Sequence, residues 1–354
     1  MKRDSCEAAE PRKSNLQDSL PSRSSRLCLS RIESRLRRVT LYTRVLAGLL
    51  AVVAVALAPT VIFAELTVAP SNALTSIERL ARGEYLVHIA GCHACHTDHQ
   101  NKGAFLAGGA AITTPFGQFY PPNITPDRET GIGTWSNAEF ATALQQGIAP
   151  DGHRYFPVFP YTSYSRLRSD DVHAIKQYLD QVVSVKRVST AHRPSGLAHF
   201  PALLASWQNI YMKPNWTAVV DPATSLQRQG AYLVEAVAHC GECHSPRDGL
   251  GGTRYDDWLR GARLPSGHQS SNLTPHADGI EDWSESELAE FLQRGRTDLG
   301  AKAEHEMREF VDHAGHFMTD ADRLAIAAYL VALPPRPNAQ ACRQTGPRYR
   351  HCWH

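Results

Sequence analysis

A five-residue motif, C-x-x-C-H, occurs twice in this chain, at residues 92–96 and again at residues 240–244. Two thiols three residues apart lie on one side of a helical turn. Both can therefore form thioethers with the vinyl groups on one edge of a porphyrin, while the imidazole that follows ligates the iron. The motifs predict two covalently bound haem c groups, attached through Cys92, Cys95, Cys240 and Cys243 and ligated on the proximal side by His96 and His244.

Two other kinds of site use a pair of cysteines at this spacing. A structural zinc site usually needs a second pair of ligands, and neither motif has one nearby in the sequence. A thioredoxin-like redox pair requires a strand–helix–strand context, and the flanking residues do not have that pattern. The recurrence of the motif favours haem attachment over both alternatives.

The two motifs belong to a longer internal repeat, which has to be recognised before a fold is assigned. Equivalent residues lie 148 to 151 positions apart: Cys92 and Cys240, Trp135 and Trp283, Gly147 and Gly295, residues 123–126 and 272–275, and residues 178–179 and 329–330. So small a drift along the repeat indicates two copies of one domain. We assign the first cytochrome c domain to residues 75–185 and the second to residues 223–333.

Each copy has the pattern of helices separated by long polar loops. Capping-box spacings occur at Thr75 with Glu78, at Ser136 with Glu139 and at Ser284 with Glu287. The glycines at positions 147 and 295 are expected to end the two short helices that the later boxes begin. Further helices are expected from Asp170 to Leu179 and from Thr319 to Leu330. No segment shows convincing strand-like alternation, so the domains are predicted to be all-α, with the haem serving as much of each core.

The amino-terminal region differs in composition from the repeats. Residues 1–44 hold eleven Lys and Arg against five Asp and Glu, a net charge of +6, and they have the polar composition of a disordered tail. Residues 45–63 form an uncharged apolar run of nineteen residues, just long enough to cross a bilayer as a helix. The basic residues before the run place its amino end in the cytoplasm. We therefore expect a transmembrane anchor at 45–64, with a cleaved signal peptide as the alternative.

The expected organisation is two tandem all-α cytochrome c domains behind an N-terminal transmembrane helix. Residues 186–222 form an apolar linker that is expected to pack against both domains, and residues 334–354 form a polar tail. The tail contains Cys342 and Cys352, and nothing in the sequence decides whether they pair. The expected location is the inner membrane of a bacterium, crossed once, with the bulk of the chain in the periplasm. The chain beyond residue 44 has a net charge of −4, which argues against a nucleic-acid partner.

Electron-carrying haems usually have a second axial ligand, most often a methionine. The chain contains only four methionines. We expect Met307 to ligate the second haem from a loop that precedes the last helix, and Met318 is the alternative.

The first copy lacks an equivalent methionine. The repeat offset from Met307 leads to Phe159, whose side chain cannot ligate iron. His153, Tyr155 and Met212 are the other candidates in that part of the chain. The sequence therefore leaves open whether the sixth position of the first haem is filled.

Several segments resemble a known family. They are N-I-T-P-D at 123–127 with T-G-I-G at 130–133, F-P-Y-T-S at 159–163, and H-C-G-E-C-H-S-P-R at 239–247. Across roughly residues 78–333 the chain resembles the multihaem cytochrome c subunits of membrane-linked bacterial dehydrogenases. These subunits serve quinoprotein alcohol dehydrogenases, flavin dehydrogenases of the gluconate type, and molybdenum hydroxylases. The chain departs from members with three haems, because it has two motifs.

This resemblance implies an electron-transfer subunit without substrate chemistry of its own. It would take electrons from a periplasmic dehydrogenase subunit and pass them to a respiratory acceptor, which is a cytochrome, an oxidase or a quinone site. An alternative is a dihaem enzyme, similar to peroxidases or thiosulfate dehydrogenases, with an open haem in the first domain. A haem-based sensor would need an output domain, and the basic tail is too simple to be one.

Overall fold

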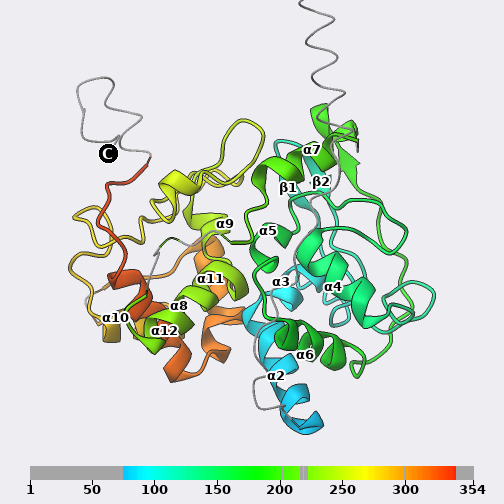
Figure 1. Cartoon of the computed structure of the whole chain (residues 1–354), viewed down its shortest axis with the longest axis horizontal. Coiled ribbons are helices and arrows are strands. Elements are labelled where there is room, and N and C mark those ends of the chain that lie inside the picture. The colour runs from blue at the N-terminus through cyan, green and yellow to red at the C-terminus, as the bar shows by residue number, and fades with distance from the viewer. Residues whose placement is uncertain (1–74, 201, 216–217, 219–221, 299, 340–354) are drawn as a thin grey trace, which may run out of the picture. The chain divides into compact units, whose positions relative to one another are not determined.

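The computed structural model describes residues 75–339 except 201, 216–217, 219–221 and 299, and all of these residues belong to one compact unit (Figure 1). The expected tail at 1–44, the expected anchor at 45–64 and the cysteines at 342 and 352 lie outside the described residues. None of the helices in the described part combines the length and apolar character that a membrane span requires.

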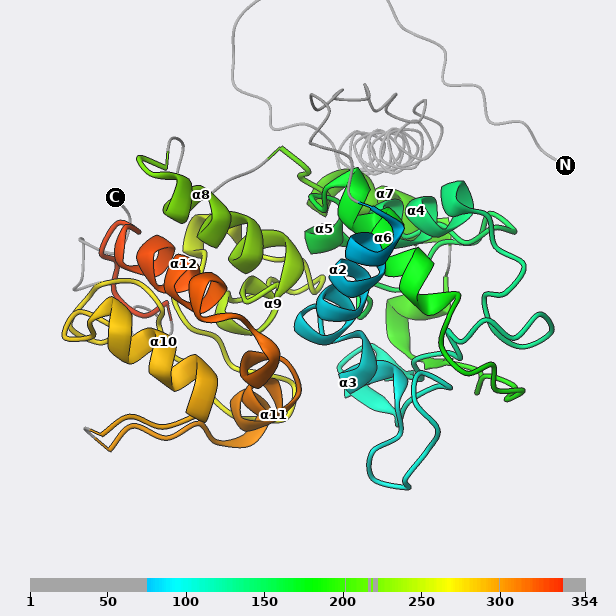
Figure 2. The same cartoon turned by 90° about the horizontal axis from the view of Figure 1, so that it is seen from below.

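Each repeat contributes the helices that the sequence predicts, together with several short ones. The first repeat contains α2 (Ser76–Ile89), α3 (Cys92–His96), α4 (Asn137–Gln146), α5 (Tyr161–Tyr164) and α6 (Ser169–Leu179). The second contains α8 (Ser225–Tyr232), the π-helix η2 (Leu233–Val237), α9 (Gly241–His244), η3 (Tyr255–Asp257), α10 (Glu285–Arg294), α11 (His305–His313), η4 (Gly315–Phe317) and α12 (Asp320–Val331). The two groups of helices can be followed in Figures 1 and 2.

The predicted helix boundaries are confirmed where the sequence carries a local signal. The three predicted capping boxes form, at the starts of α2, α4 and α10, and Thr224 with Gln227 forms a fourth at α8. Helices α4 and α10 end at Gly147 and Gly295, both in the left-handed conformation that glycine adopts without strain. Thr319 caps α12 as expected.

A small antiparallel sheet is present that the sequence did not predict. Strands β1 (Ile112–Thr114) and β2 (Gly117–Phe119) form a hairpin, and β3 (Arg193–Pro194) pairs with β2. The expectation of a purely helical domain is therefore wrong at this point, although the fold is mostly helical. The strands have two or three residues each, too few to produce a recognisable alternation of apolar and polar side chains.

The first and last helices of each repeat cross at a glycine. A methyl group added to Gly83 of α2 would lie 2.0 Å from the carbonyl oxygen of Ala174 in α6. The same group on Gly230 of α8 would lie 1.9 Å from the carbonyl oxygen of Ala325 in α12. Both distances are far below van der Waals contact. Each crossing therefore requires a residue without a side chain.

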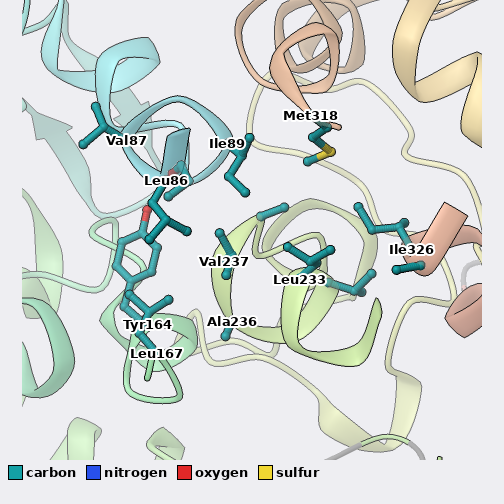
Figure 3. Packing of buried hydrophobic residues seen from close by; sticks show 14 of the residues in the cluster. Leu86, Val87, Ile89, Tyr164, Leu167, Leu233, Ala236, Val237, Met318 and Ile326 are labelled. Atoms are coloured by element: carbon teal, nitrogen blue, oxygen red, sulfur yellow. The ribbon is translucent and has the colours of Figure 1, made fainter. Parts of the chain in front are cut away.

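A continuous apolar core joins the two repeats. Figure 3 shows Ile89 of α2 in the same buried group as Leu233 and Val237 of η2 and Met318 before α12. Each of these four side chains is at most 2% exposed. We call this contact between the two repeats the seam. Removal of these side chains from water is the main stabilising contribution to it.

Two equivalent hydrogen bonds cross the seam in opposite directions. The Tyr85 hydroxyl of the first repeat donates to Asp322 of the second, and the Tyr232 hydroxyl of the second donates to Asp171 of the first, each at 2.5 Å. These tyrosines occupy equivalent positions of the first helix in each repeat, and the aspartates occupy equivalent positions of the last helix. The seam is therefore symmetric in these two polar contacts.

The double variant Tyr85→Phe/Tyr232→Phe should lower the free energy of unfolding by about 3 kcal/mol, because each hydroxyl that bonds a carboxylate contributes about 1.5 kcal/mol. Burial and the Asp322 carboxylate raise the pKa of Tyr85 to about 12, from an ordinary value of 10.0. The stabilisation by this hydroxyl should therefore be complete below pH 10 and be lost as the pH rises through 12.

Denaturant unfolding followed at pH 7 to 12 measures both effects. Tyr120→Phe is the matched control, because the one contact of the Tyr120 hydroxyl with the described residues is a long one, of 3.4 Å, with Gln118. A double variant as stable as this control would show that the two hydroxyls do not strengthen the seam.

The segment between the repeats contacts both of them, as expected. It contains η1 (Gly196–His199) and α7 (Ala202–Tyr211). The Gln208 amide donates to the Gln146 and Gly147 carbonyl groups of the first repeat. On the other side, Trp207 Nε1 donates to the carbonyl of Leu250, in the second repeat. Helix α7 therefore bridges the two repeats.

Candidate haem-attachment sites

Both C-x-x-C-H motifs fold as a single helical turn, as the spacing predicts. Helix α3 begins at Cys92, directly after Gly91, whose φ of 68° breaks the chain away from α2. In the second motif, Cys240 is the N-cap of α9. Cys92 and Cys240 are half-buried, and the second cysteine of each pair is exposed. Each pair is therefore available to an incoming group on one side of its turn.

The two proximal histidines have the same hydrogen bond. His96 Nδ1 lies 2.7 Å from the carbonyl oxygen of Pro122, and His244 Nδ1 lies 2.8 Å from that of Ser271. A carbonyl oxygen can only accept, so Nδ1 carries the proton in both rings and Nε2 has the free lone pair. A backbone partner on one nitrogen orients the ring and raises the basicity of the other as a ligand.

An asparagine turn positions the carbonyl that each histidine needs. Asn123 directly follows Pro122, and its Oδ1 accepts from the backbone N–H of Thr125 at 3.0 Å and from its hydroxyl at 2.8 Å. Asn272, directly after Ser271, does the same with Thr274, at 3.0 Å and 2.9 Å. These contacts explain why the sequence N-x-T-P recurs in both repeats. Sequence reasoning identified the turns but missed Pro122 and Ser271, which have no distinctive side chain.

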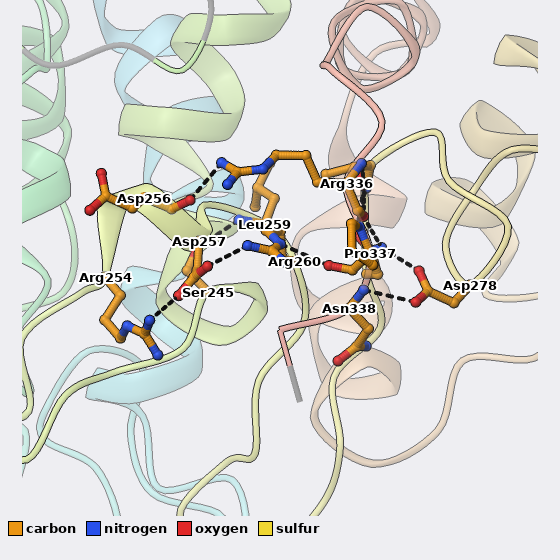
Figure 4. A network of polar contacts seen from close by, with 12 residues as sticks. Ser245, Arg254, Asp256, Asp257, Leu259, Arg260, Asp278, Arg336, Pro337 and Asn338 are labelled. Carbon is orange, nitrogen blue, oxygen red and sulfur yellow. Dashed lines mark hydrogen bonds and ion pairs between the residues drawn. The ribbon is translucent and has the colours of Figure 1, made fainter. Parts of the chain in front are cut away.

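The chain that follows the last helix of each repeat returns to this turn. Asn123 Nδ2 donates to the carbonyl of Val185 at 2.7 Å, and Asn272 Nδ2 donates to that of Arg336 at 2.8 Å. In the second repeat the returning segment is held further by Asn338 N–H, which donates to Asp278, and by Arg260, which donates to the carbonyl of Pro337 (Figure 4). Residues 336–338, which the sequence placed in the polar tail, therefore support the second site.

The segments that lead into the two attachment motifs are in contact across the seam. His239, directly before Cys240, donates from Nε2 to the carbonyl of Ala90 at 3.2 Å. The Ser163 hydroxyl of α5 donates to the Glu242 carboxylate, inside the second motif, at 2.8 Å. Arg247 also pairs with Glu242. These contacts hold the attachment turn of one haem against the domain that carries the other.

Met307 lies in a helix, as the third residue of α11, so the expectation that a loop carries it is wrong. Its side chain is half-buried and packs against the core. Met318 is 2% exposed and belongs to the seam core. In the first repeat the side chain of His153 is 59% exposed, and its ring lies 2.5 Å from Asp151.

The donor set fits a covalently attached haem. Each site has two cysteines on one turn and an imidazole whose Nε2 has an available lone pair, the groups that attachment and proximal ligation require. In the described part of the chain, no three His, Cys, Asp or Glu side chains converge in a way that could hold a bare metal ion.

Comparisons with known proteins agree with this donor set, although no family model matches the chain. A diheme cytochrome c-type protein of Cereibacter sphaeroides is 38% identical over 258 residues, which cover 72% of this chain and 86% of that protein. The fructose dehydrogenase cytochrome subunit of Gluconobacter japonicus is 36% identical over 75% of this chain. The gluconate 2-dehydrogenase cytochrome c subunit of Pantoea cypripedii is 35% identical over 73% of this chain. The match spans only 55% and 60% of these two longer relatives.

Proposed function

Because the chain belongs to the dihaem c-type cytochromes related to the cytochrome c subunits of bacterial dehydrogenases, we propose that it carries electrons from a partner dehydrogenase to the respiratory chain. It binds two haem c groups covalently. The observation that carries the proposal is the contact between the segments that lead into the two attachment turns, through His239 and Ala90. Attachment of one redox group on each side of the seam would favour electron transfer between the two groups within the molecule.

The residues of the chain would attach, orient and tune the two groups. Cys92 and Cys95 would hold one haem, and Cys240 and Cys243 the other. Each haem, when bound, supplies a one-electron couple. The backbone carbonyl groups that bond His96 and His244 keep both imidazoles in the ligating tautomer. Met307 would complete the second site, and a methionine ligand raises the potential.

We place the chain in the bacterial inner membrane, anchored by residues 45–64, with both haem domains in the periplasm. The apolar run of nineteen residues and the basic residues before it support this location. In bacteria, haem c is also attached to proteins outside the cytoplasm, at the outer face of the inner membrane. The electron acceptor would be a cytochrome, an oxidase or a quinone site in the same membrane.

Deletion of the gene in the source bacterium tests this function. Membranes would be supplied in turn with fructose, gluconate, nicotinate and ethanol, the substrates suggested by the names of the relatives. We expect oxygen uptake with one substrate to fall at least tenfold, while reduction of an artificial dye by the same dehydrogenase persists. Complementation with the wild-type chain should restore uptake, and complementation with the double variant Cys240→Ala/Cys243→Ala should not. Unchanged uptake with every substrate would contradict the proposal for these partners.

A further inference from the structure

We propose that the first haem site has no protein ligand on its distal side, and that its reduced iron binds a small neutral diatomic molecule such as carbon monoxide. The inference deepens the proposed function, and it rests on Met307 as the distal ligand of the second haem. Its basis is that Phe159 stands at the position of the first repeat that aligns with Met307 in the second.

The hairpins that lead to the two positions have the same length and the same hydrogen bonds. In the first repeat the carbonyl of Gly147 accepts from the N–H of Tyr155 at 2.8 Å. In the second, the carbonyl of Gly295 accepts from the N–H of Ala303 at 2.7 Å. The inner bonds also correspond, because Ala149 and Thr297 each donate to the carbonyl four residues later. No insertion or deletion therefore separates the two repeats within this hairpin.

One hydrogen bond recurs at the distal residue, although the turns differ: His305 has a φ of 48°, and its counterpart in the first repeat is Pro157. Phe159 donates its N–H to the carbonyl of Phe156, and Met307 donates its N–H to that of Glu304, both at 3.1 Å. Each residue lies four positions beyond the end of its hairpin. The alignment of Phe159 with Met307 therefore rests on the matched hairpins and this recurring hydrogen bond, as well as on the sequence offset.

The Phe159 ring is fixed by other aromatic side chains. It has edge contacts with Tyr155 and Tyr164, with ring centroids 5.7 Å apart in both pairs. The Tyr164 hydroxyl donates to the carbonyl of Ala90 at 2.8 Å, two residues before Cys92. This links the ring to the turn that carries the first haem. A phenyl ring has no lone pair, so the side chain held there cannot ligate iron.

The three other candidates that the sequence offers are disfavoured by their surroundings. His153 lies in the exposed turn of the hairpin and pairs with Asp151. Burial raises the pKa of Tyr155 to about 12, which disfavours the phenolate that would bind iron. Both neighbours of Met212 in the chain contact the second repeat. The Tyr211 hydroxyl donates to Asp248, and the Lys213 ammonium lies over the Tyr255 ring.

An optical titration of the reduced, purified holoprotein with carbon monoxide tests the proposal. In the wild type we expect carbon monoxide to shift the absorption bands of about half of the total haem, since one of two sites is open. Phe159→Met should abolish the shift, and Phe159→Leu, which removes the ring without adding a ligand, should retain it. High-spin ferric iron in the electron paramagnetic resonance spectrum of the oxidised wild type gives a second readout that needs no variant.

Met307→Phe separates failure of this inference from failure of the assignment on which it rests. It should open the second site, so that nearly all of the haem shifts with carbon monoxide. A wild type without any shift and without high-spin iron would overturn the open first site. If Met307→Phe then gained a shift of about half, the second site and the electron-transfer function would stand. If Met307→Phe left the wild-type response unchanged, Met307 would not be a ligand and the inference would lose its basis.

Discussion

Gly230→Val should prevent the second repeat from folding. The first side-chain carbon at this position would lie 1.9 Å from the carbonyl oxygen of Ala325 and 2.7 Å from the Cβ of Tyr329. Backbone on one side and a buried tyrosine on the other leave no room for adjustment, since Tyr329 is fully buried. Overpacking of a core costs about 1–3 kcal/mol and more where backbone has to move. Because natural domains are stable by only about 5–15 kcal/mol, we expect loss of soluble holoprotein.

Gly249→Val is the matched control for this prediction. A side chain there would meet nothing within 4 Å, so the change should leave stability within about 0.5 kcal/mol of the wild type. Soluble yield, haem content and thermal unfolding of the two variants would be compared, with Gly83→Val as the equivalent change in the first repeat. A Gly230→Val protein that unfolds at the same temperature as Gly249→Val would show that α8 and α12 are not in backbone contact.

Asn272→Leu should destabilise the second repeat by about 3–5 kcal/mol and raise the midpoint potential of its haem. Leucine has nearly the same shape but removes hydrogen bonds with Thr274, Asp278 and the carbonyl of Arg336. Asn272 is 1% exposed, so the partners that remain buried lose bonds worth about 1 kcal/mol each. The Ser271 carbonyl would also be held less firmly, which weakens the bond to His244. A less basic imidazole stabilises ferric iron less well.

Denaturant unfolding and a redox titration measure the two parts of this prediction. Asn123→Leu is the natural comparison, because it removes the equivalent turn from the first repeat. We expect each variant to change the potential of the haem in its own repeat only. Equal shifts of both potentials in either variant would mean that the turns act through the whole molecule and not through the adjacent histidine.

Features with a local origin could be predicted from the sequence. A capping box needs two side chains three residues apart, and a C-x-x-C-H motif needs five consecutive residues, so both are visible in one chain. Because the sequence is repeated, each feature assigned in one domain also predicted its equivalent in the other. Helix ends at Gly147 and Gly295 followed in the same way, because a left-handed residue there favours glycine.

Features that depend on distant segments could not be predicted. Tyr85 and Asp322 are separated by 237 residues, and no periodicity links them. The partners of the proximal histidines are backbone carbonyl groups, and any residue could supply them. The segment around Arg336 was assigned to a tail because proline interrupts helical periodicity, although its carbonyl groups complete the second site. Met307 was placed in a loop because a nine-residue helix provides little periodic signal.

The reciprocal pairs of Tyr85 with Asp322 and Tyr232 with Asp171 have a further consequence. A patch that meets its own equivalent through a two-fold relation is the defining property of an isologous dimer interface. In these two pairs the seam resembles a homodimer contact contained within one polypeptide. Fusion of the two halves makes their association intramolecular, so it does not weaken on dilution. Fusion also allows each half to diverge in sequence. Arg82 and Gln229 occupy equivalent positions, and they bind Asp171 and Asp322 respectively with different side chains.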